Sequence, residues 1–218
     1  MRGGFRRGIP FRLFQKFIYS DNYKLDFEFG CILQKTFFEM YFSKVEHIYE
    51  FGCGTGINLT DVASIFPQKH LHGCDLTQSS IKILKVLKNE MDYDIDGHQF
   101  DFTKPDYNYH LKQNSAVYTA AALEQIGENW KKFLQYLLDE KPTLVLHLEP
   151  IAELYDRENS ITDWLAYEFH QKRRYLDGYY TELLRLQKDG QIEILNTRRT
   201  YFGSWNDESY TLVVWRPL

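Results

Sequence analysis

The sequence predicts an α/β fold, in which helices cover a doubly wound and mostly parallel sheet. A glycine-rich turn at residues 52–56 joins a short apolar run to a helical stripe. A second apolar run ends in an acid, Asp75, about 20 residues further on. Strand-length apolar runs and helical stripes then alternate toward the C-terminus, which is typical of a parallel sheet.

Length and composition bound the kind of protein. A chain of 218 residues fits one domain, and 44% hydrophobic residues with 17% aromatic residues are enough for a packed core. This composition argues against disorder. The formal net charge of -4 argues against a general nucleic-acid binder, so nucleic acid is not expected as a partner.

Cysteines and apolar runs bear on the cellular location. Cys31, Cys53 and Cys74 form no metal-binding spacing, and their odd number favours reduced thiols in a cytoplasmic protein. No apolar run approaches the roughly 18 residues of a spanning helix, so no membrane span is expected. Residues 1–11 carry charge without a following apolar stretch, so we expect no secretion signal.

Residues 1–44 are expected to form a basic arm and a helical lid, ahead of a core over residues 45–218. Residues 2–24 carry six Lys or Arg against a single acid. Such an arm is most often a solvated tail, with an anion or membrane contact as the alternative. Aromatic and apolar residues predict a helix over 11–19 and a second one over 30–43.

The run His47–Phe51 is β-branched and aromatic, and it predicts a buried strand that ends at the glycine turn. Gly52, Gly54 and Gly56 alternate with small residues there. Glycine suits positions where a positive φ or the close approach of a ligand excludes a Cβ. The next helix directs its unpaired N–H groups at the turn, which suits a pyrophosphate or an amino-acid carboxylate.

Asp75 ends the second predicted strand, residues 71–75, where its carboxylate is able to accept hydrogen bonds from both hydroxyls of a ribose. A helix capped by Thr77 or Ser79 is expected to follow. The third strand is predicted over residues 97–103.

The fifth apolar run, residues 142–150, suits a central parallel strand. His147 and Glu149 are two residues apart in it, so they share one face of the strand. A carboxylate is able to orient an imidazole there as a general base. Metal ligation by these two residues with His170 is a weaker alternative, and no metal site is predicted.

The remaining elements complete the order of the sheet. Apolar residues from 115 predict a fourth strand, and a helical stripe covers 129–139. Residues 151–189 are expected to form a helical insert. The runs 191–201 and 210–216 predict a closing hairpin.

The pattern Glu50-x-Gly52-x-Gly54-x-Gly56, with Asp75 one strand further, resembles motif I of the class I S-adenosylmethionine-dependent methyltransferases. A dinucleotide-binding fold would show G-x-G-x-x-G instead. The resemblance implies a Rossmann-like fold of seven strands with an antiparallel C-terminal hairpin. It also implies S-adenosylmethionine as the cofactor and S-adenosylhomocysteine as its product.

The resemblance further implies how the cofactor is held. Glu50 would hold its amino end, Asp75 its ribose and Asp101 its adenine amino group, while Phe102 packs on the ring. For Asp101, capping of a local helix is the alternative. The full set of implied cofactor-binding residues is Glu50, Gly52, Cys53, Gly54, Gly56, Asn58, Asp75, Leu76, Asp101, Phe102 and Ala120.

The activity implied is methyl transfer to an O or N acceptor of a small molecule. The resemblance also implies that the helical insert at residues 151–189 faces the substrate. The segment around Glu124 lacks the proline-aromatic signature of enzymes that methylate base nitrogens, and Gln125 stands where a histidine is frequent. Catalytic candidates are His147, Glu149 and Glu124, and substrate candidates are Tyr19, Tyr23, Tyr155, His170 and Arg174. A protein or RNA methyltransferase and a non-catalytic cofactor-binding partner subunit are alternatives, and a homo-oligomer is left open.

Overall fold

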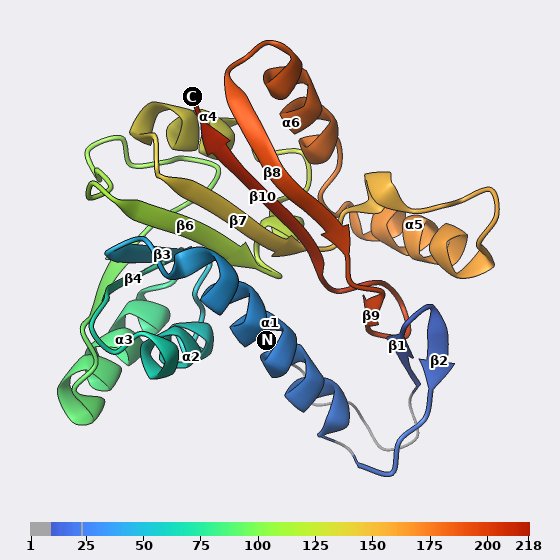
Figure 1. Ribbon diagram of the computed structural model, residues 1–218, viewed down its shortest axis with the longest axis horizontal. Coiled ribbons are helices and arrows are strands. Elements are labelled where there is room, and N and C mark those ends of the chain that lie inside the picture. Colours follow the sequence, from blue (N-terminus) through green and yellow to red (C-terminus); the bar gives the residue numbers. More distant parts are fainter. Residues whose placement is uncertain (1–9, 23) are drawn as a thin grey trace.

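A computed structural model describes residues 10–22 and 24–218 of the chain. The main sheet is built from β3 (His47–Phe51), β4 (His70–Asp75), β5 (Ile95–Gln99), β6 (Ser115–Ala120), β7 (Leu144–Glu149), β8 (Ile192–Arg199) and β10 (Thr211–Pro217). These strands lie in the order β5-β4-β3-β6-β7-β10-β8 (Figure 1). β10 is antiparallel to β7 and β8, and the other neighbouring pairs are parallel. The predicted sheet of seven strands with an antiparallel C-terminal hairpin is confirmed.

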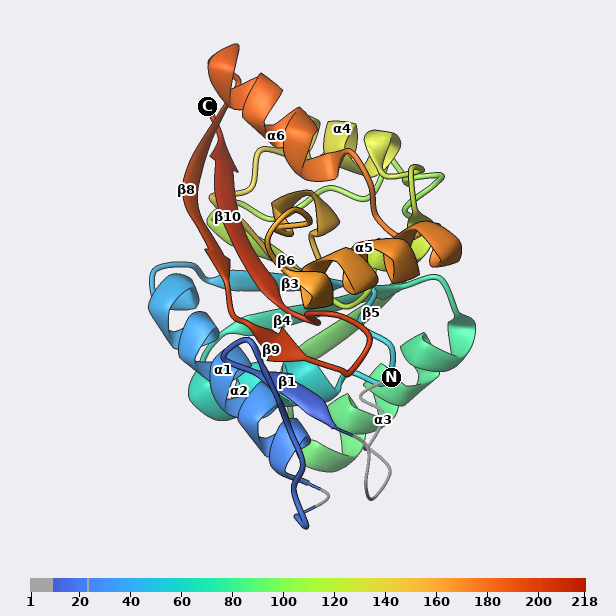
Figure 2. The same ribbon diagram turned by 90° about the vertical axis from the view of Figure 1, so that its right-hand side faces the viewer.

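Helices cover both faces of this sheet (Figure 2). They are α1 (Leu25–Phe42), α2 (Ile57–Ile65), α3 (Gln78–Met91), α4 (Lys131–Glu140), α5 (Ile161–Arg173) and α6 (Tyr179–Lys188). Two short 3-10 turns, η1 (Leu123–Ile126) and η2 (Ala152–Leu154), follow β6 and β7. This arrangement is the doubly wound one that the alternation of apolar runs predicts.

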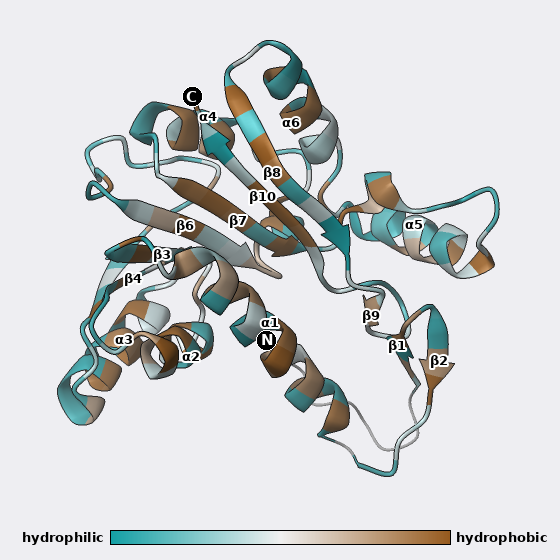
Figure 3. Ribbon diagram, in the orientation of Figure 1, coloured by the Kyte–Doolittle hydropathy of each residue, from teal (hydrophilic) through white to brown (hydrophobic). Residues whose placement is uncertain are grey.

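The core consists of two apolar layers, one on each face of the sheet. In β7, Val145 packs in the layer with α4 and α6, and Leu146 packs in the layer with α1, α2 and α3. Every residue of β7 is buried, as expected of a central strand covered on both faces. Figure 3 shows hydrophobic residues along β7 and through the middle of β10.

The helix predicted over residues 11–19 is wrong. This segment forms a hairpin of β1 (Phe11–Leu13) and β2 (Lys16–Ile18), and β1 also pairs with β9 (Phe202–Gly203). The turn residues Phe14 and Gln15 have φ values of 49° and 64°, which is the backbone of a two-residue hairpin. Neither is a glycine or an asparagine, and the pairing partner β9 lies near the other end of the chain. The local sequence therefore indicated neither the turn at Phe14 and Gln15 nor the pairing with β9.

α1 confirms the helix predicted over 30–43 and begins five residues earlier, at Leu25. Its Phe38 and Phe42 pack against Tyr118 of β6, with ring centroids 5.0 and 5.5 Å away. The second half of α1 is therefore part of the core. The division of the chain at residue 44 stays a prediction.

β5 ends at Gln99, four residues before the predicted end of the third strand. Asp101 and Phe102 consequently lie in the loop after the strand. Within the ranges that the structure describes, no helix combines the length and the apolarity that a bilayer crossing requires.

Candidate active site

The glycine turn is bonded to the end of β4. The N–H groups of Gly52 and Cys53 donate to the carbonyl of Cys74, at 2.7 and 3.1 Å. A Cβ on Gly52, where φ is 78°, would lie 2.3 Å from the Cβ of Ala122. A Cβ on Gly56 would lie 2.6 Å from Leu84. These two glycines are required because other parts of the chain pack closely against them.

Gly54 differs from the other two glycines. Its φ is 52°, and nothing lies within 4 Å of the position that a Cβ would take. Its N–H donates to Asp75 Oδ2 at 2.9 Å. The space beside Gly54 is therefore open and is bordered by the carboxylate of Asp75.

Asp75 is held as an anion at the carboxyl end of β4. Burial alone raises the pKa of this carboxyl, but hydrogen bonds from Thr77 and Gly54 outweigh it and lower the pKa. Asp75 Oδ1 accepts from both the N–H and the hydroxyl of Thr77, each at 2.9 Å. Thr77 also caps α3 through Ser80 N–H, which confirms one of the two predicted caps.

Glu50, expected to hold the amino end of the cofactor, is fully buried below the turn. Its Oε1 accepts from Asn58 Nδ2 at 2.5 Å, which links β3 to the first turn of α2. The side chain of Cys53 lies in the same buried apolar cluster as Leu59, which leaves the main chain of Cys53 to face the turn. The cofactor contacts of Glu50, Cys53 and Asn58 stay predictions.

The residues expected at the adenine end lie beside β4 and β5. Leu76, next to Asp75, is 60% exposed. The Phe102 ring packs edge-to-face against the Phe133 ring, with ring centroids 4.6 Å apart. Asp101 Oδ1 accepts from the N–H and the hydroxyl of Thr103, at 2.8 and 2.7 Å. These bonds close a local turn, and no helix follows before Pro105, so the alternative of a helix cap at Asp101 is wrong. Its contact with adenine stays a prediction.

Glu149 holds the loop that follows Ala120 at the end of β6. Its carboxylate accepts from the N–H groups of Ala122, Leu123 and Glu124 at 3.1–3.2 Å. The side chain is fully buried, and burial raises the pKa of its carboxyl although these N–H groups oppose the rise. The geometry is that of a positioning residue, because both oxygens are committed to the main chain.

His147, expected to be a general base, is enclosed in the core. Its Nδ1 lies 2.9 Å from Thr119 Oγ1, and its Nε2 lies 2.7 Å from the Tyr179 hydroxyl. Burial lowers the pKa of the imidazole to about 3, so the ring is neutral. A ring with no exposed surface and both nitrogens engaged is out of reach of a substrate, which argues against the expected role.

Glu124 is the catalytic candidate that keeps some exposure. Burial, together with the charges of Glu149 and Asp207, raises the pKa of its carboxyl. Asp207 Oδ2 in turn lies 3.3 Å from His170 Nε2. Asp207 was not anticipated, because it lies in a turn-rich segment without periodicity, and only the fold brings it to α5.

The structure brings together two of the expected substrate residues. Tyr155 and His170 are buried, with ring centroids 5.7 Å apart. Tyr19 is 70% exposed, and Arg174 is exposed at the C-terminal end of α5. Tyr23 lies outside the described residues. Over residues 10–22 and 24–218, no group of three metal-ligating side chains comes together.

No sequence-family profile and no curated protein sequence matches the chain. Solved structures share its fold. A SAM-dependent methyltransferase from Aquifex aeolicus has a TM-score of 0.55 at 12% identity, over 84% of this chain and 87% of that one. The plantazolicin methyltransferase BpumL has a TM-score of 0.56 at 14% identity, over 88% and 83%.

The [4+2]-cyclase SpnF is also similar, with a TM-score of 0.62 at 15% identity over 86% of this chain and 80% of that one. Identities this low show the fold alone. The chain has the Rossmann-like fold of the class I S-adenosylmethionine-dependent methyltransferases. Because a cyclase shares this fold, the fold does not by itself settle the reaction.

Proposed function

We propose that the protein transfers a methyl group from S-adenosylmethionine to an oxygen or nitrogen atom of a small molecule. The observation that carries the proposal is the open turn at Gly54, bordered by an ionised Asp75 at the neighbouring strand end. When bound, the cofactor supplies a methyl group already activated on a sulfonium.

The residues around the turn fit this cofactor. The open space beside Gly54 lets a ligand approach the main chain closely. The N-terminal end of α2 faces this space. Asp75 is an anion, and its Oδ2, which accepts from Gly54 N–H, keeps capacity for a hydrogen bond from a ribose hydroxyl. Exposed Leu76 offers an apolar surface at the adenine end.

Proton removal from the acceptor is assigned to Glu124. A raised pKa makes its ionised carboxylate a stronger base than an ordinary glutamate. Glu149 fixes the main chain of the same loop, and so fixes where Glu124 stands. Holding acceptor and methyl donor at near-attack distance is worth roughly 7–11 kcal/mol.

Two features support a small-molecule acceptor. The β1–β2 hairpin meets the helical insert at α5 beside the sheet. Arg12 of the hairpin donates a hydrogen bond to the carbonyl of Thr162 there. In addition, BpumL, of the same fold, is known in complex with a small desmethyl plantazolicin analogue and S-adenosylhomocysteine.

Cofactor binding is tested by isothermal titration calorimetry with S-adenosylhomocysteine. We expect saturable 1:1 binding, and a loss of at least about tenfold in Asp75→Ala, because one charge-assisted hydrogen bond is worth about 1.5–3 kcal/mol. Asp96→Ala is the matched control, since Asp96 pairs with Lys88 on the surface. Equal affinity in Asp75→Ala and the control would contradict the ribose contact.

Methyl transfer is tested separately, by incubating the protein with methyl-labelled cofactor and a metabolite extract. We expect label in a small molecule, and a kcat lowered by about 10²-fold or more in Glu124→Gln with unchanged cofactor affinity. Label in protein or RNA would favour the macromolecular alternatives. Cofactor binding without any transferred label would favour a non-catalytic partner subunit.

A further inference from the structure

A cavity of about 140 Å³ lies between the β1–β2 hairpin, the start of α5 and the end of β8. Its walls include Arg12, Lys16 and Phe17 of the hairpin, Asp163 of α5, and Arg199 and Tyr201 at the end of β8. Nothing in the cofactor-binding proposal uses these residues. Their charges decide what the cavity is able to bind.

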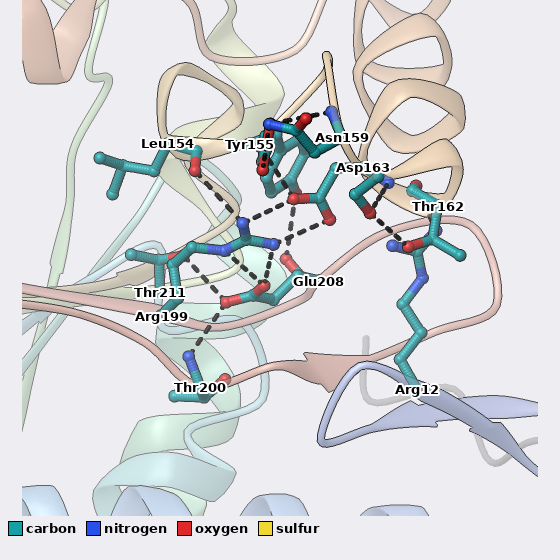
Figure 4. A network of polar contacts seen from close by, with 12 residues as sticks. Arg12, Leu154, Tyr155, Asn159, Thr162, Asp163, Arg199, Thr200, Glu208 and Thr211 are labelled. Atoms are coloured by element: carbon teal, nitrogen blue, oxygen red, sulfur yellow. Dashed lines mark hydrogen bonds and ion pairs between the residues drawn. The ribbon is translucent and has the colours of Figure 1, made fainter.

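Arg199 is fully engaged by carboxylates. Its Nε and Nη2 donate to Glu208 Oε2 at 2.9 and 2.8 Å, and its Nη1 and Nη2 donate to Asp163 at 2.6 and 2.9 Å (Figure 4). Glu208 accepts also from Thr200 N–H at 3.0 Å. Asp163 and Glu208 are therefore already matched by a cation, and Glu208 also by a main-chain donor. The third acid of the wall, Asp156, accepts hydrogen bonds from Asn159.

Arg12 is a buried cation without such a match. It is 7% exposed, and its Nη2 donates to the carbonyl of Thr162 at 3.1 Å (Figure 4). The same Nη2 donates to the carbonyl of Asn206 at 3.0 Å. Its Nε is buried with no hydrogen-bond partner. Among the described residues, no acid forms an ion pair with it. Burial lowers the pKa of this guanidinium, although the acids nearby oppose the fall.

A buried guanidinium with an unpaired donor is costly unless an anion lies close to it, and Arg12 is one of the residues that line the cavity. Carboxylate and phosphate oxygens match the geometry of its Nε and Nη groups. Lys16 adds a second cation on the neighbouring strand. Phe17, 5.4 Å from the Arg12 guanidinium, and Tyr201 supply apolar surface for the rest of a ligand.

We propose that this cavity binds the anionic group, a carboxylate or a phosphate, of a small organic molecule through Arg12 and Lys16. The inference rests on the proposed function in one respect, which is that the molecule is the methyl acceptor. The buried face of α5 links the two places. It carries Asp163 in the cavity wall and His170, seven residues on, beside Asp207. Asp163 thus lies about 10 Å along α5 from His170. The loop of Glu124 is bonded just beyond this end of the helix, where Leu176 N–H donates to the Glu124 carbonyl.

The test titrates the full chain with phenyl phosphate, phenylacetate and neutral benzyl alcohol by calorimetry. We expect the anions to bind 1:1, at least about tenfold more tightly than benzyl alcohol. The better of the two anions identifies phosphate or carboxylate as the group bound. Arg12→Gln should weaken the anions by about tenfold or more, and Lys16→Gln by a few-fold. Arg216→Gln, which changes an exposed cation on β10, should have no effect.

Arg12 also ties the hairpin to α5, so the exposed Lys16 provides the variant that leaves folding intact. No saturable anion binding, equal affinity for benzyl alcohol, or unchanged affinity in both cavity variants overturns the proposal. S-adenosylhomocysteine should bind all variants equally. Its failure to bind the unmodified protein would contradict the proposed function, while the anion titration still decides the cavity.

Discussion

The three glycines of one motif have two different physical roles. Gly52 and Gly56 are glycines because Ala122 and Leu84 occupy the space that a Cβ would need. Gly54 has open space instead, and in the proposed site that space would admit the cofactor. Their spacing in the sequence does not distinguish these roles.

Alanine substitutions should separate the two roles. Gly54→Ala should lower stability by only about 1–2 kcal/mol, because alanine is strained at a positive φ. It should weaken the binding of S-adenosylhomocysteine at least tenfold, because the new Cβ fills the open space beside residue 54. Gly52→Ala should cost more stability, because Ala122 must move as well. Urea unfolding and calorimetry measure the two effects. Wild-type affinity in Gly54→Ala would show that the open space is not the cofactor site.

His147 should make folding stability depend on pH. Its pKa is about 3 in the folded protein and about 6.5 when unfolded. Between these values only the unfolded state binds the proton, so stability is present above pH 6.5 and is lost as the pH falls. Wild type should lose about 2 kcal/mol more than His147→Gln between pH 7 and pH 5. Urea unfolding at both pH values tests this, and identical losses would contradict the buried neutral ring.

At the scale of elements, one ion cluster joins segments that are distant in the sequence. Arg199 at the end of β8 connects Asp163 of α5 with Glu208 before β10. It also donates to the carbonyl of Leu154 in η2 at 3.2 Å. Arg199 therefore links the start of α5 and η2 to the C-terminal hairpin, beside the packing of α6 on β8.

Arg199→Met should destabilise the protein by about 3–5 kcal/mol, because two buried carboxylates lose their cation. Arg216→Met is the matched control. It removes an exposed pair with Glu193 and should cost less than about 1 kcal/mol. Chemical denaturation of the two variants gives the comparison. A similar small cost for both would mean that the cluster does not hold the insert.

At the scale of the molecule, the order of the sheet assembles the site. The parallel strands β3, β4, β6 and β7 end at one edge, which carries the glycine turn, Asp75 and the loop of Glu124. Cofactor binding at this edge contacts several strands at once, so it should stabilise the whole fold.

S-adenosylhomocysteine at 100 times its Kd should add about 2.7 kcal/mol, which raises Tm by roughly 5–11 °C for a domain of this size. In Asp75→Ala, with an affinity at least about tenfold lower, the same concentration should raise Tm by about half as much or less. Differential scanning calorimetry measures both shifts. An equal shift in the variant would contradict the contribution assigned to Asp75.

The sequence by itself determined the sheet, the glycine turn and the place of Asp75. Apolar runs and helical stripes are local properties of the chain. The positive φ angles of the turn at Gly52, Gly54 and Gly56 are local as well, and they favour glycine. The position of β7, predicted over 142–150 and observed over Leu144–Glu149, and a cap at Thr77 or Ser79 could be predicted for the same reason.

Only the tertiary structure decided the roles of the polar residues. His147 and Glu149 stand at the predicted strand end, but burial by Tyr179 and the amides of η1 commits them to the core. The hairpin at Phe11–Ile18 and the unmatched charge of Arg12 depend on segments from the other end of the chain. Burial and charge pairing are sums over neighbours in space, and no spacing along the chain contains those neighbours.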